Sequence, residues 1–348
     1  RNDKTTHYAV ENIFNNIISH DRIFIAEYDF SKFFDKISHK FIINALESNK
    51  FFISNTEMHV IKSFLSTQQS NVGVPQGTSI SLFLANAACS SLDKSLESAG
   101  INFARYADDT ILWSNKYEKI CEGAEIISEF SKKSAIPLNI DKSEGISLLV
   151  KETAKPQELS KTKTSISYLG YSITPQHIGL NEKIIVRIKK KISYIIYKHL
   201  IQPIKHNTIC NRNVTIFDDK DVVVTLQEIR RYIYGDLSEK KIQEFLFGGT
   251  AQIHFKGLLS NFPLIDDVEQ LKSLDGWMAN SLMRALRRRY TLLNMQHIFK
   301  YKKSTVFIKD YEKNKNKGYC IPSFRLLYNA LKKGIKLNGL HFNGFYNS

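Results

Sequence analysis

The sequence predicts an α+β protein, and three observations lead to that fold class. Short runs of alternating apolar residues in the first half of the 348-residue chain predict strands and a hairpin. Apolar residues recur at helical spacing between these runs and through most of the second half. A hydrophobic content of 43% with 24% charged residues is ordinary for a globular protein and excludes a wholly disordered chain. At about 150 residues per domain, the length predicts two domains.

The elements of the first half follow from these patterns in chain order. Residues 21–30 predict a strand that ends at Asp29, and residues 38–50 predict a helix with Ser38 as its cap. The elements expected after them are a turn over 71–77, a helix over 79–97, a β-hairpin over 101–114, a helix over 118–134, and strands over 136–149 and 165–174.

From about residue 181 the pattern becomes helical and basic. The expected helices cover 181–200, 222–234, 238–247, 266–290 and 323–333, with a polar break over 203–221 and an exposed basic loop over 313–318. We therefore expect one domain over residues 1–180 and a second, helical domain over residues 181–348.

The net charge differs between the two halves of the sequence. Residues 1–180 carry 19 Lys and Arg against 20 Asp and Glu, whereas residues 181–348 carry 30 against 14. The whole excess of +15 therefore belongs to the second half. Such asymmetry favours a polyanionic partner, above all nucleic acid, with a membrane surface as the alternative.

The cysteines and the length of the apolar runs indicate the cellular compartment. The four cysteines lie far apart in the sequence without paired spacing, which favours buried thiols in a reducing, cytoplasmic compartment. No apolar run reaches 18 residues, so no membrane-spanning helix and no membrane partner is predicted. The start has no signal-peptide pattern, and because it opens abruptly on Arg1 we expect an N-terminal piece to be missing.

Three carboxylates stand where chemistry is expected. Asp29 ends a predicted strand, and Asp108 and Asp109 lie in the turn of the predicted hairpin. Carboxylates at strand ends suit hard cations such as Mg²⁺, which leave open positions for phosphate. Two adjacent Asp residues are also a common turn composition, so this feature taken alone does not decide between the two interpretations.

The surrounding motifs decide between them. The chain contains, in order, YDFSKFFD over 28–35, VPQGTS over 74–79, RYADD over 105–109, LNIDKS over 138–143 and YLGY over 168–171. In this order and at these spacings the motifs resemble the successive palm motifs of reverse transcriptases, over roughly residues 7–175. The resemblance implies a polymerase palm, an antiparallel sheet with helices in a right-hand fold, followed by a helical thumb and C-terminal region.

The resemblance also implies roles for individual residues. Asp29, Asp108 and the Phe30 carbonyl would bind two Mg²⁺ ions, for which Mn²⁺ could substitute, and Asp109 would support the second ion. Phe34 would block a ribose 2′-hydroxyl, and Phe33 would belong to the core, because successive strand side chains point to opposite faces. Further roles fall to Gln76 and Gly77 in the nucleotide pocket, to Lys142 as the proton donor to pyrophosphate, and to Tyr168, Leu169, Gly170 and Tyr171 as the primer grip.

Plainer interpretations stay open for several of these residues. Lys142 would equally be a surface lysine, and the YLGY segment a buried strand with a turn glycine.

Basic residues after residue 180 are the expected nucleic-acid contacts. They are Arg187, Lys189, Lys190 and Lys191 on one predicted helix, and Arg284, Arg287, Arg288 and Arg289 on another. A solvated helix face is the alternative for such a charge run.

The chain also departs from the wider family. In the family a fingers hairpin precedes the palm, and here residues 1–18 could supply only its tail. Either the given chain lacks the hairpin or the fingers are reduced, so the cations that would bind the triphosphate are not identified. No endonuclease cluster or RNase H pattern follows the palm, which argues against an intron-mobility protein or a retroviral enzyme. The outline resembles bacterial stand-alone reverse transcriptases, most of all the defence-associated, abortive-infection-like group and next the retron enzymes. Looser similarity to the defence-associated group is carried by the segments 255–257, 262–267 and 274–277.

The resemblance leads to three functional hypotheses. The first is a reverse transcriptase that makes DNA from dNTPs on an RNA template, with a dedicated non-coding RNA and a second defence protein as partners in antiphage defence. The second is a polymerase of the same fold that extends DNA without a conventional template. The third is a nucleic-acid-binding palm protein without catalysis, against which the three intact aspartates argue.

Overall fold

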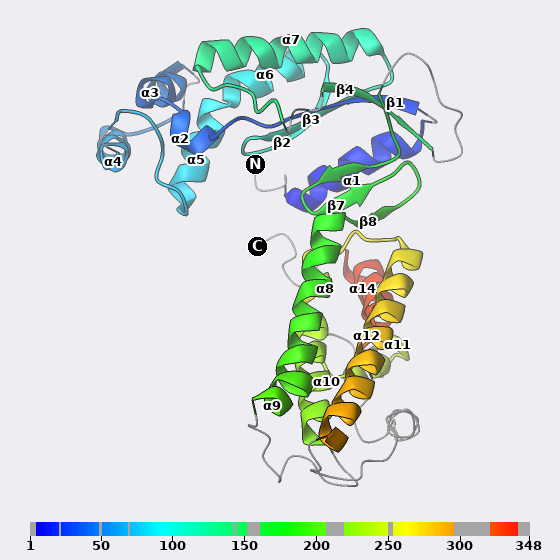
Figure 1. Cartoon of the computed structure of the whole chain (residues 1–348). Coiled ribbons are helices and arrows are strands. Elements are labelled where there is room, and N and C mark those ends of the chain that lie inside the picture. The colour runs from blue at the N-terminus through cyan, green and yellow to red at the C-terminus, as the bar shows by residue number, and fades with distance from the viewer. Residues whose placement is uncertain are drawn as a thin grey trace. The chain divides into compact units, whose positions relative to one another are not determined.

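The computed structural model describes residues 5–20, 22–48, 51–68, 70–141, 143, 145–151, 161–206, 219–249, 253–295 and 321–339. The fold is α+β, as the sequence predicts, and the chain divides into two compact units (Figure 1). The first unit holds residues 1–166 and 174–176, and the second holds residues 167–173 and 177–348.

The first unit is built on a five-stranded sheet. Its strands are β1 (Arg22–Tyr28), β2 (Asn102–Tyr106), β3 (Asp109–Ser114), β4 (Gly145–Val150) and β5 (Thr162–Lys163), in the order β2-β3-β1-β4-β5. All neighbours are antiparallel except β4 and β5. β1 is therefore central, between β3 and β4, which is why most of its residues are buried.

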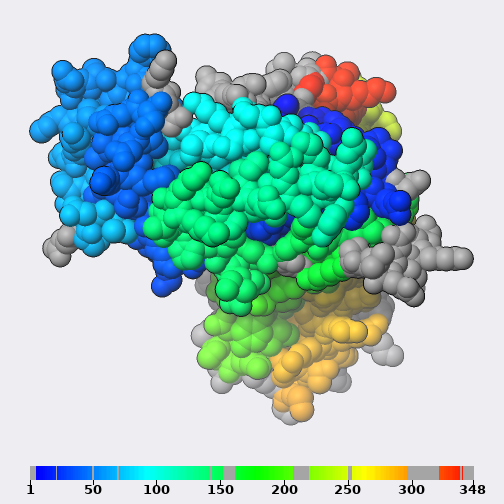
Figure 2. Space-filling view, turned by 90° about the horizontal axis from the view of Figure 1, so that it is seen from above, coloured from blue at the N-terminus to red at the C-terminus, as the bar shows by residue number. Residues whose placement is uncertain are grey.

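Helices cover the sheet and form the rest of the unit. α6 (Ser90–Ser98) and α7 (Tyr117–Ser134) lie on one face, which Figure 2 shows from above, and α1 (Thr6–Ile18) lies below the sheet in Figure 1. The remaining helices are α2 (Phe33–Lys36), α3 (His39–Ser48), α4 (Asn55–Leu65) and α5 (Ser79–Ala88). A core that includes Tyr28, Phe30 and Phe33 joins these helices to β1.

Three details differ from the sequence predictions for this unit. The helix expected over 79–97 is two helices, because the chain bends at Cys89, which ends α5 and begins α6. The strand expected over 136–149 is confined to β4, and before it only Leu138 forms an isolated bridge, to Phe30. Helix α4 was not predicted, although the reciprocal hydrogen bonds of Ser54 and Glu57 form a capping box at its start.

The second unit combines a small sheet with a group of helices. The strands β6 (Ile166–Tyr168), β7 (Tyr171–Ile173) and β8 (Ile178–Leu180) pair in that order. The helices are α8 (Glu182–Ile196), the π-helical η1 (Tyr197–Ile201), α9 (Gln202–Lys205), α10 (Lys220–Tyr234), α11 (Glu239–Leu246), the 3₁₀ segment η2 (Leu258–Asn261), α12 (Val268–Met295) and α14 (Phe324–Asn338). The helices expected over 222–234, 238–247, 266–290 and 323–333 are confirmed, with ends that shift by up to five residues. The helix expected over 181–200 is α-helical only to Ile196 and continues as the π-helical η1.

The helices of this unit pack through apolar stripes. α8 buries Ile185, Ile188 and Ile192, which recur at helical spacing, and turns its charged residues outward. α8, α10 and α12 run side by side in Figure 1. Among the described residues, no helix is both long and apolar enough to cross a membrane.

Candidate active site

Asp29 lies directly after the central strand and is held by the loop that precedes β4. The Asn139 side-chain amide donates to Asp29 Oδ2 at 3.0 Å, and the Asn139 backbone N–H donates to the Asp29 carbonyl at 2.7 Å. The Asp29 backbone N–H in turn donates to Ser143 Oγ at 3.2 Å. These bonds fix the backbone and one carboxylate oxygen of Asp29, so its position is set before any ligand binds.

Asp108 and Asp109 lie at the β2–β3 hairpin. The last pair of the hairpin is Tyr106 with Asp109, so Ala107 and Asp108 alone form the turn and Asp109 is the first residue of β3. Ala107 has a φ of 54°, a left-handed conformation that is uncommon for residues other than glycine. The tight turn thus presents Asp108 at the tip and Asp109 beside it.

Sheet register brings the three carboxylates to one end of the sheet. β1 and β3 are antiparallel, and their last pair in this direction is Tyr28 with Thr110. One step further along both strands places Asp29 opposite Asp109, with Asp108 adjacent in the turn. The backbone register therefore brings residues that are 79 positions apart in the sequence to neighbouring strand ends.

Arg105 ties the turn to the neighbouring helices. Its guanidinium donates to both carboxylate oxygens of Asp93 on α6, at 2.8 and 2.6 Å, and its Nη1 donates to the Ala107 carbonyl at 2.9 Å and to Asn86 on α5 at 3.1 Å. The Arg105 side chain is 6% exposed. A partly buried, bidentate pair of this kind defines one geometry, because the planar guanidinium matches the carboxylate. It braces the strained residue directly before Asp108.

The buried thiol of Cys89 belongs to the same cluster. Burial raises its pKa to about 12, against an attraction to Arg105 that lowers it, while the nearby carboxylates of Asp93 and Asp108 raise it further. The thiol is therefore neutral and unreactive at physiological pH. Cys121 is partly buried, and Cys210 and Cys320 lie outside the described residues.

The donor atoms at this end of the sheet fit a divalent cation such as Mg²⁺. In the described part of the chain, no three His, Cys, Asp or Glu side chains gather closely enough to hold a metal by themselves. Mg²⁺ does not require such a cluster, because it is commonly held by one or two carboxylates and the phosphates of a substrate. The Phe30 carbonyl is a further hard donor, since the hydrogen bonds that join its segment to the Leu138 segment are made by Asp29 and Ser31 on either side of it.

Phe33 and Phe34 have the different environments that the sequence predicted. Phe33 is 1% exposed in the core, whereas Phe34 is only partly buried and meets the Phe33 ring edge-on at 5.5 Å. The predicted reason was wrong, because both residues lie on helix α2 rather than on a strand. Successive helical residues are separated by about 100° around the axis, which also directs the two rings to different sides.

The segment 74–77 lies against α2. The Val74 N–H donates to the Phe34 carbonyl at 2.7 Å, and the Gln76 side chain donates to Asp35 at 3.0 Å. Gly77 has a φ of +90° and open space around its Cα. A residue with a Cβ would be strained at this φ, so the glycine serves the backbone conformation here. Lys142 lies outside the described residues.

The YLGY segment is a two-residue hairpin between β6 and β7. Leu169 and Gly170 form its turn with φ values of 49° and 85°. Both tyrosines are almost fully buried, and burial raises the pKa of Tyr171. The tyrosine rings thus belong to the core, and Leu169 and Gly170 are the more exposed residues of this segment.

Residues of the loosely matching C-terminal segments support this hairpin. Phe262 packs edge-on against Tyr171 at 5.3 Å and lies directly over Gly170. Asp266 accepts a hydrogen bond from the Ile178 N–H on β8 at 2.6 Å, and Asp275 caps α14 by accepting from the Phe324 N–H at 2.7 Å. These segments therefore have structural roles within the second unit.

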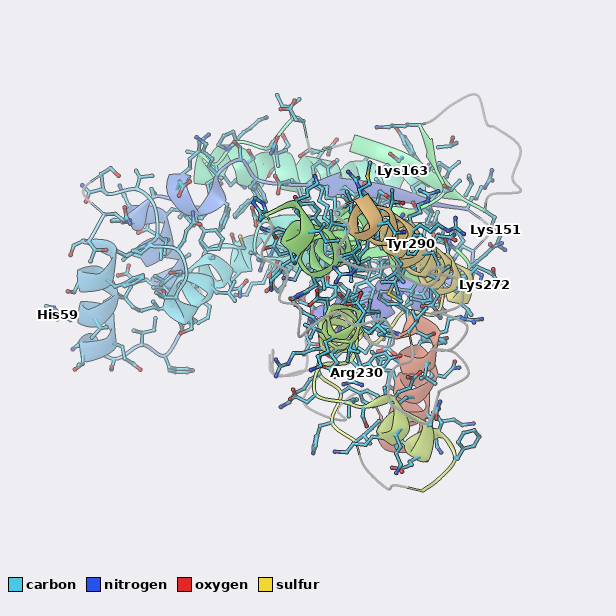
Figure 3. The ribbon with its side chains drawn as sticks, turned by 60° about the horizontal axis from the view of Figure 1, so that its bottom comes forward. His59, Lys151, Lys163, Arg230, Lys272 and Tyr290 are labelled. Atoms are coloured by element: carbon cyan, nitrogen blue, oxygen red, sulfur yellow. The ribbon has the colours of Figure 1, made fainter. Side chains whose placement is uncertain are left out.

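The basic residues of the second unit separate into exposed and buried ones. Arg187, Lys190 and Lys191 are exposed on α8, and Lys189 is partly buried with its ammonium over the Trp277 ring at 5.9 Å. Further cations extend from Arg230 on α10 and Lys272 on α12 (Figure 3).

The run on α12 divides in the same way. Arg284, Arg287 and Arg288 are exposed, whereas Arg289 is 2% exposed. Arg289 donates to Asp219 at 2.8 Å and to Asp221 at 2.7 Å. Burial opposes its charge, but these two carboxylates outweigh that effect and raise its pKa. The prediction that Arg289 binds nucleic acid was therefore wrong, because its guanidinium is already bound inside the unit.

Sequence reasoning missed Asn139, Ser143, Asp93 and the structural role of Arg105. Asn139 and Ser143 stand in the LNIDKS motif, so the motif itself contained the signal. The Asp93 partnership has no sequence signal, because an ion pair between a strand and a helix 12 residues away depends on the tertiary fold.

Comparison with known proteins agrees with the geometry of the first unit. Residues 6–173 match the family model described as reverse transcriptase (RNA-dependent DNA polymerase). No curated protein matched the chain.

Several solved structures resemble the chain at low identity. Apo telomerase from Candida tropicalis has 12% identity and a TM-score of 0.43, with 94% of this chain and 58% of that chain covered. Telomerase from Candida albicans in complex with a TWJ fragment of telomeric RNA has 14% sequence identity and a TM-score of 0.38. The match covers 81% of this chain and 50% of that chain. The foamy viral protease-reverse transcriptase in complex with dsDNA has 14% sequence identity and a TM-score of 0.32. The match covers 74% of this chain and 41% of that chain. The chain spans about half the length of the telomerase chains, and similarity at this level carries no argument about function.

Proposed function

We propose that the chain is an RNA-directed DNA polymerase that adds deoxynucleotides to a DNA end on an RNA template. Residues 6–173 match the family model described as reverse transcriptase (RNA-dependent DNA polymerase), which supports the proposal. The observation that carries the proposal is the strand register that brings Asp29, Asp108 and Asp109 to adjacent strand ends. Each carboxylate is presented by backbone that other residues hold in place, through Asn139 for Asp29 and Arg105 for the turn.

The proposed reaction is an in-line displacement at the α-phosphate of a dNTP. When bound, two Mg²⁺ ions activate the 3′-hydroxyl and stabilise the leaving pyrophosphate. Asp29 and Asp108 would hold the ions together with the Phe30 carbonyl, and Asp109 would support the second ion. Because Asn139 and Ser143 hold Asp29 and Arg105 holds the turn that carries Asp108, little reorganisation is needed when substrate arrives.

Phe34 is the proposed selector of the sugar. Its ring is partly exposed, and its backbone is tied to the segment that carries Gln76 and Gly77. A rigid aromatic ring beside the sugar leaves no space for a 2′-hydroxyl. Phe34→Ala should raise the rate with ribonucleotides relative to deoxynucleotides about 10-fold or more. Phe41→Ala is the control, because Phe41 is also partly buried but packs on Phe130. An unchanged ratio in Phe34→Ala would show that Phe34 only fills space.

Priming and strand contacts complete the proposal. The Leu169–Gly170 turn would contact the primer end through its backbone, and the exposed cations of α8 and α12 would contact phosphates. Lys142 remains the proposed proton donor to pyrophosphate.

The biological role we propose is antiphage defence in the bacterial cytoplasm, with a dedicated non-coding RNA as template. Support comes from the resemblance of the palm motifs and of the segments 255–257, 262–267 and 274–277 to the defence-associated group. Template-independent synthesis by the same active site is the second candidate, because the carboxylate geometry serves either reaction.

The decisive experiment measures dNTP incorporation by the purified protein on an RNA template with a DNA primer. We expect incorporation that depends on Mg²⁺ and is lost in Asp108→Asn. Asp236→Asn, at an exposed carboxylate of the second unit, is the control and should keep the parental rate. Parental activity in Asp108→Asn would refute the catalytic assignment. Sequencing the product with and without nuclease treatment of copurified RNA separates templated from untemplated synthesis.

A further inference from the structure

The segment that carries Gln76 is held against α2 by backbone hydrogen bonds. The Gly73 N–H donates to the Ile37 carbonyl at 2.8 Å, and the Val74 N–H donates to the Phe34 carbonyl at 2.7 Å. Both partners lie in the same compact unit of the chain. The backbone that leads to Gln76 therefore has a fixed place beside α2.

His39 secures the same segment from α3. Its ring Nε2 lies 2.8 Å from the Gly73 carbonyl, which can only accept a hydrogen bond, so Nε2 carries the hydrogen. His39 is 8% exposed, and Gly73 lies so close to α2 that a Cβ on it would be 3.1 Å from the Asp35 carbonyl. The segment and α2 thus touch directly at Asp35.

Side chains continue this contact at Asp35 and Gln76. Gln76 Nε2 donates to Asp35 Oδ1 at 3.0 Å. An ionised carboxylate accepts hydrogen bonds and donates none, so only the amide nitrogen of Gln76, and not its carbonyl, can face Asp35. The carbonyl oxygen Oε1 therefore points away from Asp35, and no residue that the structure describes donates a hydrogen bond to it. Asp35 thereby limits an amide with two possible orientations to the one that presents an acceptor.

The presented acceptor matches the sugar of a deoxynucleotide. That sugar keeps one hydroxyl, at the 3′ position, and the hydroxyl needs an acceptor for its hydrogen once water is displaced. Phe34, the proposed selector against a 2′-hydroxyl, is bonded through its carbonyl to Val74, two residues before Gln76. The Phe34 ring and the Gln76 amide are therefore carried by joined backbone segments, and together they can contact two positions of one sugar.

We propose that Asp35 is a positioning residue that holds the Gln76 amide with its carbonyl toward the 3′-hydroxyl of the incoming nucleotide. Asp35 touches no substrate and acts through Gln76. The inference rests on the proposed function, in which Gln76 lines the nucleotide pocket, and it adds a second element of sugar selection to Phe34. A nucleotide without the 3′-hydroxyl leaves the Gln76 carbonyl without a partner, so the protein should discriminate against it.

The test measures kcat/KM for a dNTP and for the matching 2′,3′-dideoxynucleotide on a primed RNA template, and takes the ratio of the two. A hydrogen bond of this kind changes such a ratio by about 2–10-fold. D35A should lower the ratio by about that factor, and Q76M, which keeps the length of the side chain but not its amide, by as much or more. Because Asp35 acts through Gln76, the double variant should match Q76M alone. D35E keeps an acceptor-only group and should recover part of the preference.

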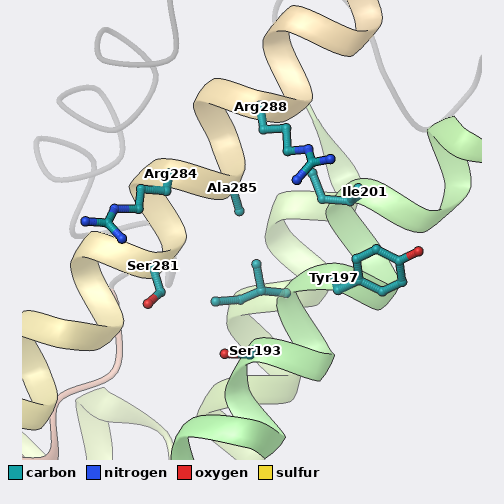
Figure 4. Close-up of a pocket in the computed structure, with 8 residues that line it drawn as sticks. Ser193, Tyr197, Ile201, Ser281, Arg284, Ala285 and Arg288 are labelled. Atoms are coloured by element: carbon teal, nitrogen blue, oxygen red, sulfur yellow. The ribbon is translucent and has the colours of Figure 1, made fainter.

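Two control variants separate this effect from a general loss of rate. Lys36→Ala changes the exposed residue next to Asp35, at the end of α2, and should keep the parental ratio. Arg284→Gln changes a residue that lines the groove between α12 and the junction of α8 with η1 (Figure 4). It should weaken strand binding and lower the rates with both nucleotides alike, again with the parental ratio.

Three results would overturn the inference. A parental ratio in D35A beside a lowered one in Q76M would show that Gln76 contacts the sugar without help from Asp35. Effects of D35A and Q76M that add in the double variant would show that Asp35 has a structural role of its own. A parental ratio in Q76M would show that the amide does not contact the hydroxyl. Failure of the proposed function is distinct, because it appears as absent dNTP incorporation in the parent protein.

Discussion

At the scale of single residues, the carboxylates depend on a backbone that other side chains keep in a strained form. Ala107 has a left-handed φ of 54°, which costs a residue with a Cβ about 1–2 kcal/mol. Arg105 opposes that cost by donating to the Ala107 carbonyl while Asp93 holds its guanidinium from the other side. The orientation of Asp108 therefore depends on a residue that never touches substrate.

Arg105→Gln should slow nucleotide incorporation about 10–100-fold, because a displacement of about 1 Å at the turn is sufficient for that effect. The change should appear in kcat more than in KM for the dNTP, since Arg105 positions the carboxylates and does not line the nucleotide pocket. It should also lower the free energy of unfolding by about 1–3 kcal/mol, because a hydrogen-bonded, partly buried pair loses one partner.

Arg105→Lys and Asp93→Asn are the companion variants for this measurement. Lysine keeps the charge but not the two-pronged geometry and should recover only part of kcat. Assays well below the melting temperature of each variant keep loss of fold from being counted as loss of rate. A parental kcat in Arg105→Gln would show that the turn holds its shape unaided.

Cys89 leads to a prediction about pH. Burial raises the pKa of its thiol to about 12 in the folded protein, whereas an exposed cysteine ionises near pH 8.5. The stabilisation linked to the neutral thiol is therefore complete below pH 8.5 and is lost as the pH rises toward 12. The stability difference between the parent and Cys89→Ala should shrink by about 2 kcal/mol from pH 8.5 to pH 10. Urea unfolding at several pH values measures it, and a constant difference would contradict the raised pKa.

At the scale of elements, the β6–β7 hairpin depends on one glycine. Gly170 has a φ of +85°, and a Cβ there would lie 2.8 Å from the Phe262 ring. Gly170→Ala should lower the free energy of unfolding by about 2–4 kcal/mol through backbone strain and overpacking.

A matched control for this change lies in the same unit. Gly276 is inside α12 with open space around it, so Gly276→Ala should raise stability by about 0.5–1 kcal/mol. Chemical denaturation of both variants measures the contrast. A loss of similar size in both would mean that the turn geometry is not responsible.

Element prediction from sequence succeeded where burial is periodic and failed where it is not. α8 and α12 bury residues at regular helical intervals, and both were predicted. α4 buries only Ile61 and Leu65, so its apolar pattern is too sparse to indicate a helix. The bend at Cys89 was invisible because the buried series Ala85, Ala88 and Leu92 continues through it.

At the candidate site, too, residues in local motifs were predicted from the sequence and tertiary contacts were not. Motif order led to Asp29, Asp108, Asp109 and Phe34, but no local pattern gives the pairing of Arg105 with Asp93. The burial of Arg289 did have a signal. It lies on the spacing of Leu282, Leu286 and Leu293, the buried stripe of α12, and that period separates it from the exposed arginines.

At the scale of the whole molecule, the candidate catalytic carboxylates and the excess positive charge lie in different halves of the sequence. The carboxylates stand in the first 180 residues, which are nearly neutral, and the excess of cations lies after them. Concentrating cations in the second half of the sequence gives that half an attraction for a polyanion.

This division predicts that the salt-dependent affinity for nucleic acid comes from direct contacts of exposed cations in the second unit. It should not come from the net charge of the whole protein. Arg187, Lys190 and Lys191 are exposed on α8, and replacing all three by Gln should reduce the slope of log K against log salt by about 2–3. The control replaces Lys116, Lys132 and Lys133, exposed residues at the two ends of α7 in the first unit, and changes the net charge equally. The slope of this control variant should change by less than the contribution of one phosphate contact, about 0.7–0.9. The reason is that a long-range charge effect is weak beyond the Debye length of about 8–10 Å. Binding to the primer–template duplex from 50 to 400 mM salt measures both variants. Equal changes in the two would mean that the protein attracts nucleic acid through its overall charge, and that α8 has no defined contact with the strand.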